Sequence, residues 1–146
     1  MEAQSAIATV GQAIQLSVAP AFLLSSIAGM LAVLSSRLTR VIDQARTAEA
    51  RVIELRAGER TSLFDRLDTL SHRAKLVNLA ITFCTVTALL VCIVIATLFV
   101  GAFLHVETAP VVAVLFVASM SAFIAGLFCF LREVFIATAA LRIGPR

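Results

Sequence analysis

The alternation of apolar and charged positions divides the chain into three apolar spans and one charged stretch. Residues 17–36, 76–104 and 109–131 contain no charged residue. Each is long enough for a transmembrane helix, which needs about 20 apolar residues. The stretch 37–75, between the first two, holds nine of the twelve basic residues of the chain. The pattern predicts an all-α membrane protein with three transmembrane helices and a charged segment between the first and the second.

The segment that precedes the first span, residues 1–16, is weakly amphipathic. Its apolar side chains recur at spacings of three and four, which is typical of an interfacial helix or of the start of span one. The uncharged run then continues to Ser36, which is longer than one crossing requires. Pro20 lies inside this run and favours a kink or a break in the first helix.

The charged stretch 37–75 has heptad periodicity in two rows. The first row ends before Gly58, a residue type that often terminates helices, and the second row begins after it. We therefore expect an antiparallel helical hairpin that turns around 58–61 and continues into spans one and two. The seam of this hairpin is predicted to contain Leu38, Val41, Ala45, Ala48, Val52 and Leu55 on the first arm and Leu63, Leu67, Leu70 and Ala74 on the second.

The composition and the placement of charge support the membrane assignment. Only 14% of the residues are charged, whereas soluble domains average about 25%. The stretch 37–75 has nine basic residues against six acidic ones, and the tail 132–146 has three against one. Because basic residues accumulate on the cytosolic side of a membrane, both segments are expected there. The N-terminus would then lie outside and the C-terminus inside.

Each predicted span meets the cytosolic boundary with charged residues. We expect these junction charges to lie at one level, where they would form ion pairs or contact anionic lipid headgroups. Pairs of Glu133 with Arg37 or Arg40 are expected. Asp43 is expected to pair with Arg73 or Arg132. The junction charges are Arg37, Arg40, Asp43, Arg73, Lys75, Arg132 and Glu133.

Small residues and scattered polar residues suggest how spans pack. Span one contains two rows of small residues with the four-residue spacing that permits close helix contacts in lipid. One row is Ala21, Ser25 and Gly29, and the other is Ala28, Ala32 and Ser36. On span two, Asn78, Thr82, Thr85 and Cys92 share one face and are weak candidates for lining a pore, with ordinary helix packing as the alternative.

The apolar residues Ile42 and Ile53 fall outside the hairpin seam. They would stay exposed if the hairpin packed only on itself, so they are a possible oligomer face and favour a homo-oligomer. The predicted function is a homo-oligomeric membrane protein with a channel-like pore. The alternative is a scaffold or accessory subunit that does not transport and whose hairpin docks a protein partner.

The sequence contains no recognisable catalytic constellation. His72 and His105 are predicted on opposite sides of the membrane, and the three cysteines lie in apolar segments without metal-type spacing. Motifs for phosphate binding are also missing. We therefore expect a protein that is not an enzyme, needs no cofactor or metal, and does not bind nucleic acid.

The run PAFLLSSIAGMLAVLSSRLTRVIDQAR (Pro20–Arg46), the charged helical segment and FLRE (Phe130–Glu133) resemble a bacterial membrane family. This family is catalogued as domain of unknown function 2721. The resemblance extends over nearly the whole chain and implies a small multi-spanning protein of the bacterial inner (cytoplasmic) membrane. It implies no catalytic residues.

Overall fold

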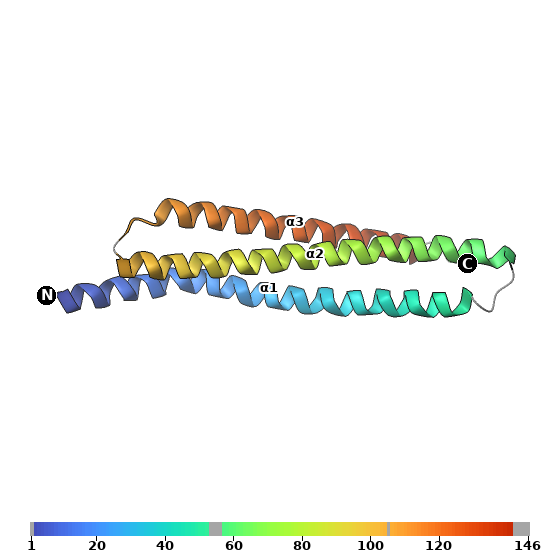
Figure 1. Cartoon of the computed structure of the whole chain (residues 1–146), viewed down its shortest axis with the longest axis horizontal. Coiled ribbons are helices and arrows are strands. Elements are labelled where there is room, and N and C mark those ends of the chain that lie inside the picture. The colour runs from blue at the N-terminus through green and yellow to red at the C-terminus, as the bar shows by residue number, and fades with distance from the viewer. Residues whose placement is uncertain (1, 53–56, 105, 142–146) are drawn as a thin grey trace. The chain divides into compact units, whose positions relative to one another are not determined.

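The chain is all-α in a computed structural model, which describes residues 2–52, 57–104 and 106–141. Within these ranges there are three helices: α1 (Glu2–Val52), α2 (Ala57–Leu104) and α3 (Ala109–Leu141) (Figure 1). Each contains a stretch that is long and apolar enough to cross a membrane. These stretches are Val10–Ala50, Leu67–Leu104 and Ala109–Thr138. The helices therefore indicate a membrane protein, as the hydropathy pattern predicts.

Helix α1 continues through Pro20 without a break, in contrast to one of the two expectations for this residue. A proline inside a helix removes a single backbone donor. A break within an apolar segment would leave several backbone groups unpaired, and each of these is costly in lipid. Continuing the helix is the cheaper solution.

Helix α2 begins at Ala57, so the expected turn at 58–61 is wrong. Gly58 lies in the first turn of α2, so it does not act as the residue that terminates α1. The cost of a glycine in a helix is about 1 kcal/mol, which a helix of 48 residues can absorb. Residues 53–56, which include Ile53 and Leu55, lie outside the described residues, as do the side chains of Val52 and Leu63.

Helix α3 extends to Leu141, so the helix continues past span three as far as this residue. Thr108 immediately precedes α3, and its carbonyl accepts a hydrogen bond from the backbone N–H of Val112 at 3.0 Å. Pro110 occupies the first turn, where a helix has no internal partner for the missing N–H. The proline therefore fits the beginning of this helix.

The chain divides into two compact units. The first unit comprises Met1–Met30 and Phe83–Ile124. Fully buried positions in it include the hydroxyl residues Thr87 and Ser119. Its buried apolar residues are Ala13, Ile27, Cys84, Val91 and Val94. Large apolar side chains such as Phe22, Phe103 and Val114 are 70–77% exposed, as expected for surfaces that face lipid.

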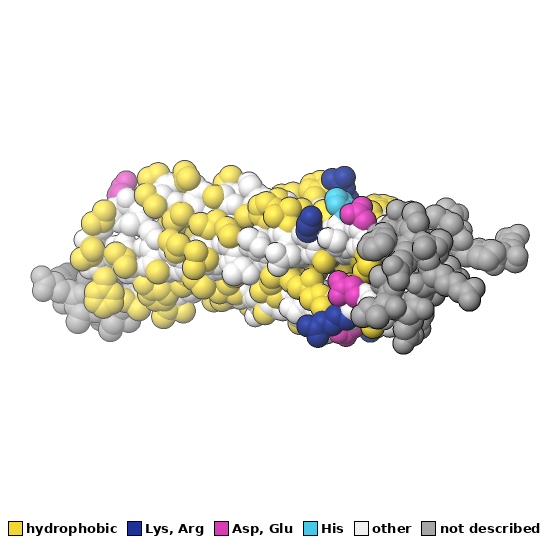
Figure 2. Space-filling model, turned by 45° about the vertical axis from the view of Figure 1, so that its right-hand side comes forward, with side chains coloured by type: hydrophobic (Ala, Val, Ile, Leu, Met, Phe, Trp, Pro, Cys, Tyr) yellow, Lys and Arg dark blue, Asp and Glu magenta, His cyan; other side chains and the backbone are white. Residues whose placement is uncertain are grey.

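The second unit comprises Leu31–Thr82 and Ala125–Arg146. Its buried apolar residues are Leu34, Val41, Val77 and Ala80, and Glu133 is buried with them. Apart from Glu107, every charged residue whose side chain is described belongs to this unit. On the face shown in Figure 2, the Lys, Arg and His side chains are gathered in one region, while apolar side chains cover much of the remaining surface.

Candidate functional site

A buried carboxylate, that of Glu133 on α3, is held by two arginines from two other helices. The Glu133 side chain is 1% exposed. Nη1 of Arg37 on α1 donates a hydrogen bond to its Oε2 at 2.9 Å. Nη2 and Nε of Arg73 on α2 donate to its Oε1 at 2.9 and 3.3 Å. These three residues, which we call the Glu133 clamp, join all three helices within the second unit.

The spacing of buried residues explains why these side chains meet. Arg37 stands between the buried Leu34 and Val41 at intervals of three and four, so it projects from the core face of α1. Arg73 precedes the buried Val77 by four residues on α2. On α3, Glu133 follows Gly126 and Phe130 at intervals of four and three. Each charged residue therefore occupies a position in a row whose other members are buried or, in the case of Phe130, half-buried.

Phe130 provides a second contact for Arg37. The guanidinium carbon of Arg37 lies 5.1 Å from the centroid of the Phe130 ring, within the range of a cation–π interaction. Phe130 and Glu133 are almost one turn apart on α3, so both hold the same guanidinium. The Arg37 side chain nevertheless remains 38% exposed, whereas that of Arg73 is 18% exposed.

The hydrogen bonds of the Glu133 clamp satisfy the buried carboxylate. Among the described residues, no buried side-chain nitrogen or oxygen lacks a partner. Charged hydrogen bonds of this kind are stronger than neutral ones, and removing one member of a buried pair leaves the other charge uncompensated. Because arginine donors occupy both oxygens of Glu133, the geometry suits a cross-link between helices better than ligand binding at this carboxylate.

The other junction charges lie at the surface: Arg40, Asp43, Lys75 and Arg132 are exposed. The pair of Arg37 with Glu133 is one of those expected from the sequence. Arg73, by contrast, was one of two partners expected for Asp43, the other being Arg132, and it binds Glu133 instead. Within the part of the chain that the structure describes, Asp43 has no ion pair. Water can solvate the exposed Asp43, while the buried Glu133 needs protein donors.

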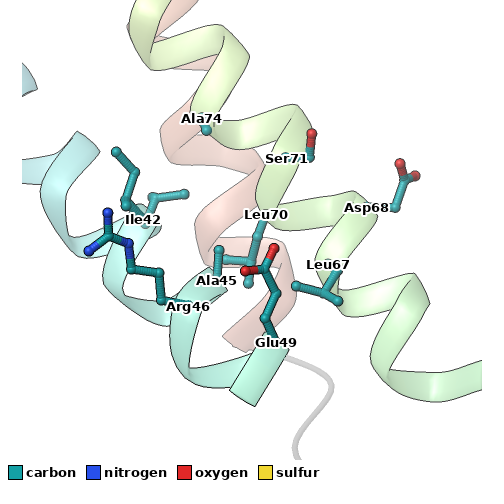
Figure 3. A pocket seen from close by; sticks show the side chains of 10 residues that line it. Ile42, Ala45, Arg46, Glu49, Leu67, Asp68, Leu70, Ser71 and Ala74 are labelled. Carbon is teal, nitrogen blue, oxygen red and sulfur yellow. The ribbon is translucent and has the colours of Figure 1, made fainter. Parts of the chain in front are cut away.

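A groove of about 490 Å³ lies between α1 and α2 in the second unit (Figure 3). Five of the predicted seam residues line it: Val41, Ala45, Leu67, Leu70 and Ala74. The remaining lining residues are Ile42, Arg46, Glu49, Asp68 and Ser71. Leu38 and Ala48, the other seam residues whose side chains are described, are half-buried. The seam is therefore partly open to the surroundings.

Comparison with known families identifies the chain. The family described as "Protein of unknown function (DUF2721)" matches residues 17–143. The chain belongs to this family. No curated protein and no solved structure matches the chain. The matched range includes all three residues of the Glu133 clamp and every residue that lines the groove.

The four pore-lining candidates on α2, Asn78, Thr82, Thr85 and Cys92, are all exposed in the single chain. The hydroxyl of Thr82 donates to the carbonyl of Asn78 at 3.0 Å, as hydroxyl residues in apolar helices commonly do. Leu89 shares their face by helical spacing and is 62% exposed. Sequence reasoning about polar positions passed over this leucine, which interrupts the polar row.

The described residues contain no group of three or more His, Cys, Asp or Glu side chains that could hold a metal ion. His72 is exposed on α2. His105, the other histidine, lies outside the described residues.

Proposed function

We propose that this protein is an integral protein of the bacterial inner membrane that assembles as a homo-oligomer. Its N-terminus would lie outside, and residues 37–75 and the C-terminus would lie on the cytosolic side. Three apolar helices support membrane insertion, and the distribution of basic residues supports this orientation. The part of α1 and α2 beyond the membrane would form an antiparallel hairpin. In support, residues from both predicted seams line one groove.

The observation that carries the oligomer is the exposure of the small residues on α1. Small side chains let helices approach closely in lipid, where apolar burial alone gives little drive for association. The members of both small-residue rows are exposed in the single chain: Ala21, Ser25, Ala28, Gly29, Ala32 and Ser36. A side-chain carbon added at Gly29 would meet no atom within 4 Å. This face is therefore available to a second copy.

Native mass spectrometry or mass photometry of the protein in nanodiscs tests the oligomer. We expect wild-type particles at multiples of the 15.5 kDa chain. Gly29→Leu places bulk on the small-residue face and should shift the distribution towards single chains. Ala113→Leu, at an exposed position of α3, adds comparable bulk elsewhere and should leave the distribution unchanged. Wild-type protein that is monomeric at every concentration would rule out the proposal.

Within this assembly, we propose that α2 lines a channel-like pore. The exposed row of Asn78, Thr82, Thr85 and Cys92 supports this role, because hydroxyl and amide groups can line a path for ions. Flux measurements in proteoliposomes provide the test. Ion flux should appear with wild-type protein and fall several-fold with Thr82→Leu. Thr97→Leu, another replacement of a threonine on the same helix, serves as the control.

A second candidate function is a scaffold or accessory subunit that transports nothing. The exposed Leu89 favours it, because an apolar side chain within the polar row would hinder hydration of a pore. An intact oligomer with no flux above that of empty liposomes would support the scaffold and exclude the channel.

A further inference from the structure

The groove between α1 and α2 has an apolar floor and a charged rim. Ile42, on the α1 side, is 40% exposed. Arg46 and Glu49 belong to the α1 rim and Asp68 to the α2 rim, and all three are exposed. Figure 3 shows the guanidinium of Arg46 and the carboxylate of Asp68 on opposite sides of the groove, pointing away from each other. The α1 wall thus presents a cation, Arg46, beside an anion, Glu49, and the α2 wall presents the anion Asp68.

The structure shows no ion pair for these rim charges, Arg46, Glu49 and Asp68, among the residues that it describes. A surface that offers a cation on one wall and an anion on the other is complementary to an equivalent surface. In an assembly with an axis along the membrane normal, equivalent residues of different copies lie at the same depth. The arginine wall of one copy can therefore meet the aspartate wall of the next.

A row of exposed residues on α1 leads into the groove. Its members follow one another at intervals of three and four, and therefore share one face of the helix. Small or hydroxyl side chains come first, and the hydroxyl of Thr39 donates to the carbonyl of Ser35 at 3.1 Å. This hydroxyl would need no new partner if the face were covered. The row consists of Ala32, Ser35, Thr39, Ile42, Arg46 and Glu49.

We propose that a second copy of this chain covers the groove, with Arg46 of one copy paired to Asp68 of the next and Ile42 buried beside the pair. The proposal rests on the proposed homo-oligomer and assigns part of its interface outside the apolar spans. Continuity along α1 supports it, since the exposed row joins the groove to Ala32, which also belongs to the small-residue face. Arg46 on one wall and Asp68 on the other favour another copy of the same surface as the occupant, because each residue finds its counter-charge there.

Charge reversal in separately tagged copies tests this pairing. Arg46→Glu alone should place two acidic residues opposite each other, and Asp68→Arg alone two basic residues. Since like charges across an interface are strongly unfavourable, each variant alone should weaken association by about tenfold or more. When the two variants are co-expressed, each contact between unlike variants again joins opposite charges. Mixed oligomers should then form with nearly wild-type yield in pull-down and native mass spectrometry.

Two controls and one further combination of the reversals make the outcome decisive. Arg132→Glu reverses an exposed charge on α3 that does not line the groove, and should leave the oligomer intact. The thermal midpoint of each variant in detergent shows that it is folded. Rescue only when both reversals are on the same chain would place the pair within one copy and overturn the proposal.

Failure of this proposal can be told apart from failure of the oligomer itself. A wild-type oligomer that is unaffected by either reversal would exclude the groove as an interface while leaving the homo-oligomer standing. Wild-type protein found only as single chains would exclude both. Lipid retained in the groove of an intact oligomer, seen as added mass that is lost with Ile42→Glu, would also overturn the pairing.

Discussion

Buried polar side chains serve different purposes in the two units of this protein. In the first unit, the hydroxyls of Thr87 and Ser119 donate to carbonyls of their own helices, those of Phe83 and Phe116, both at 2.8 Å. In the second unit, Glu133 is equally buried, but its partners lie on two other helices. A hydroxyl that donates its hydrogen bond within its own helix does not determine which helix packs against it.

This difference indicates that polar contacts between helices specify their rotation and register in the second unit and not in the first. Apolar side chains in a membrane tolerate many arrangements, because lipid and protein surfaces are similarly apolar. Both oxygens of the Glu133 carboxylate have donors only when Arg37 and Arg73 face it together, and an arrangement in which neither did would bury an unpaired charge. We infer that the Glu133 clamp selects the arrangement of the second unit. The first unit depends instead on shape.

The largest effect is expected from removing the charge of Glu133. Glu133→Gln leaves two guanidinium groups without a counter-ion and should lower the free energy of unfolding by about 3 kcal/mol. This value lies at the lower end of the range for a broken buried ion pair, because Arg37 is partly exposed. Thermal unfolding in detergent measures it. Glu107→Gln makes the same change at an exposed position and should have little effect. Equal midpoints for both variants would contradict the clamp.

The next largest effect is expected in the first unit, at Gly101. A side-chain carbon at this position would clash with Oγ1 of Thr108 and lie 2.8 Å from its Cγ2. Gly101→Ala should therefore destabilise the protein by about 1–3 kcal/mol. Gly11→Ala is the matched control, because a carbon there meets no atom within 4 Å. If both variants unfold at the same temperature, close packing does not determine the structure of the first unit.

The two arginines of the Glu133 clamp should differ in importance. Arg73 makes two hydrogen bonds to Glu133 and is more buried, whereas Arg37 makes one. Lysine keeps the charge but loses the planar fork of donors. We expect Arg73→Lys to cost about 1–2 kcal/mol and Arg37→Lys about half of that. Denaturation in mixed detergent micelles gives the order, and the reverse order would contradict the geometry.

The smallest effect is expected from the buried hydroxyl of Thr87. Thr87→Val removes a bond within one helix and keeps the shape of the side chain, so stability should change by less than about 1 kcal/mol. Thr97→Val, at a less buried position with the same type of bond, provides the comparison. A loss several times larger for Thr87→Val would show that the first unit also depends on its polar groups.

The apolar helices were predictable from the sequence because hydropathy and length determine which segments can cross a membrane. The position of Glu133 among junction charges indicated a partner such as Arg37. Its second partner, Arg73, was not predictable, because sequence spacing does not reveal how two distant helices are rotated relative to each other. The start of α2 at Ala57 was missed because one glycine is a weak signal against the helical tendency of its neighbours.

A double-mutant cycle between Arg73 and Glu133 tests the central claim most directly. Unfolding free energies are measured for the wild type, Arg73→Met, Glu133→Gln and the double variant under the same detergent conditions. The Glu133 clamp predicts that the double variant loses far less than the sum of the single losses, with a coupling energy of about 2 kcal/mol. Losses that add to within about 0.5 kcal/mol would show that the two residues do not act on each other, and would contradict the clamp.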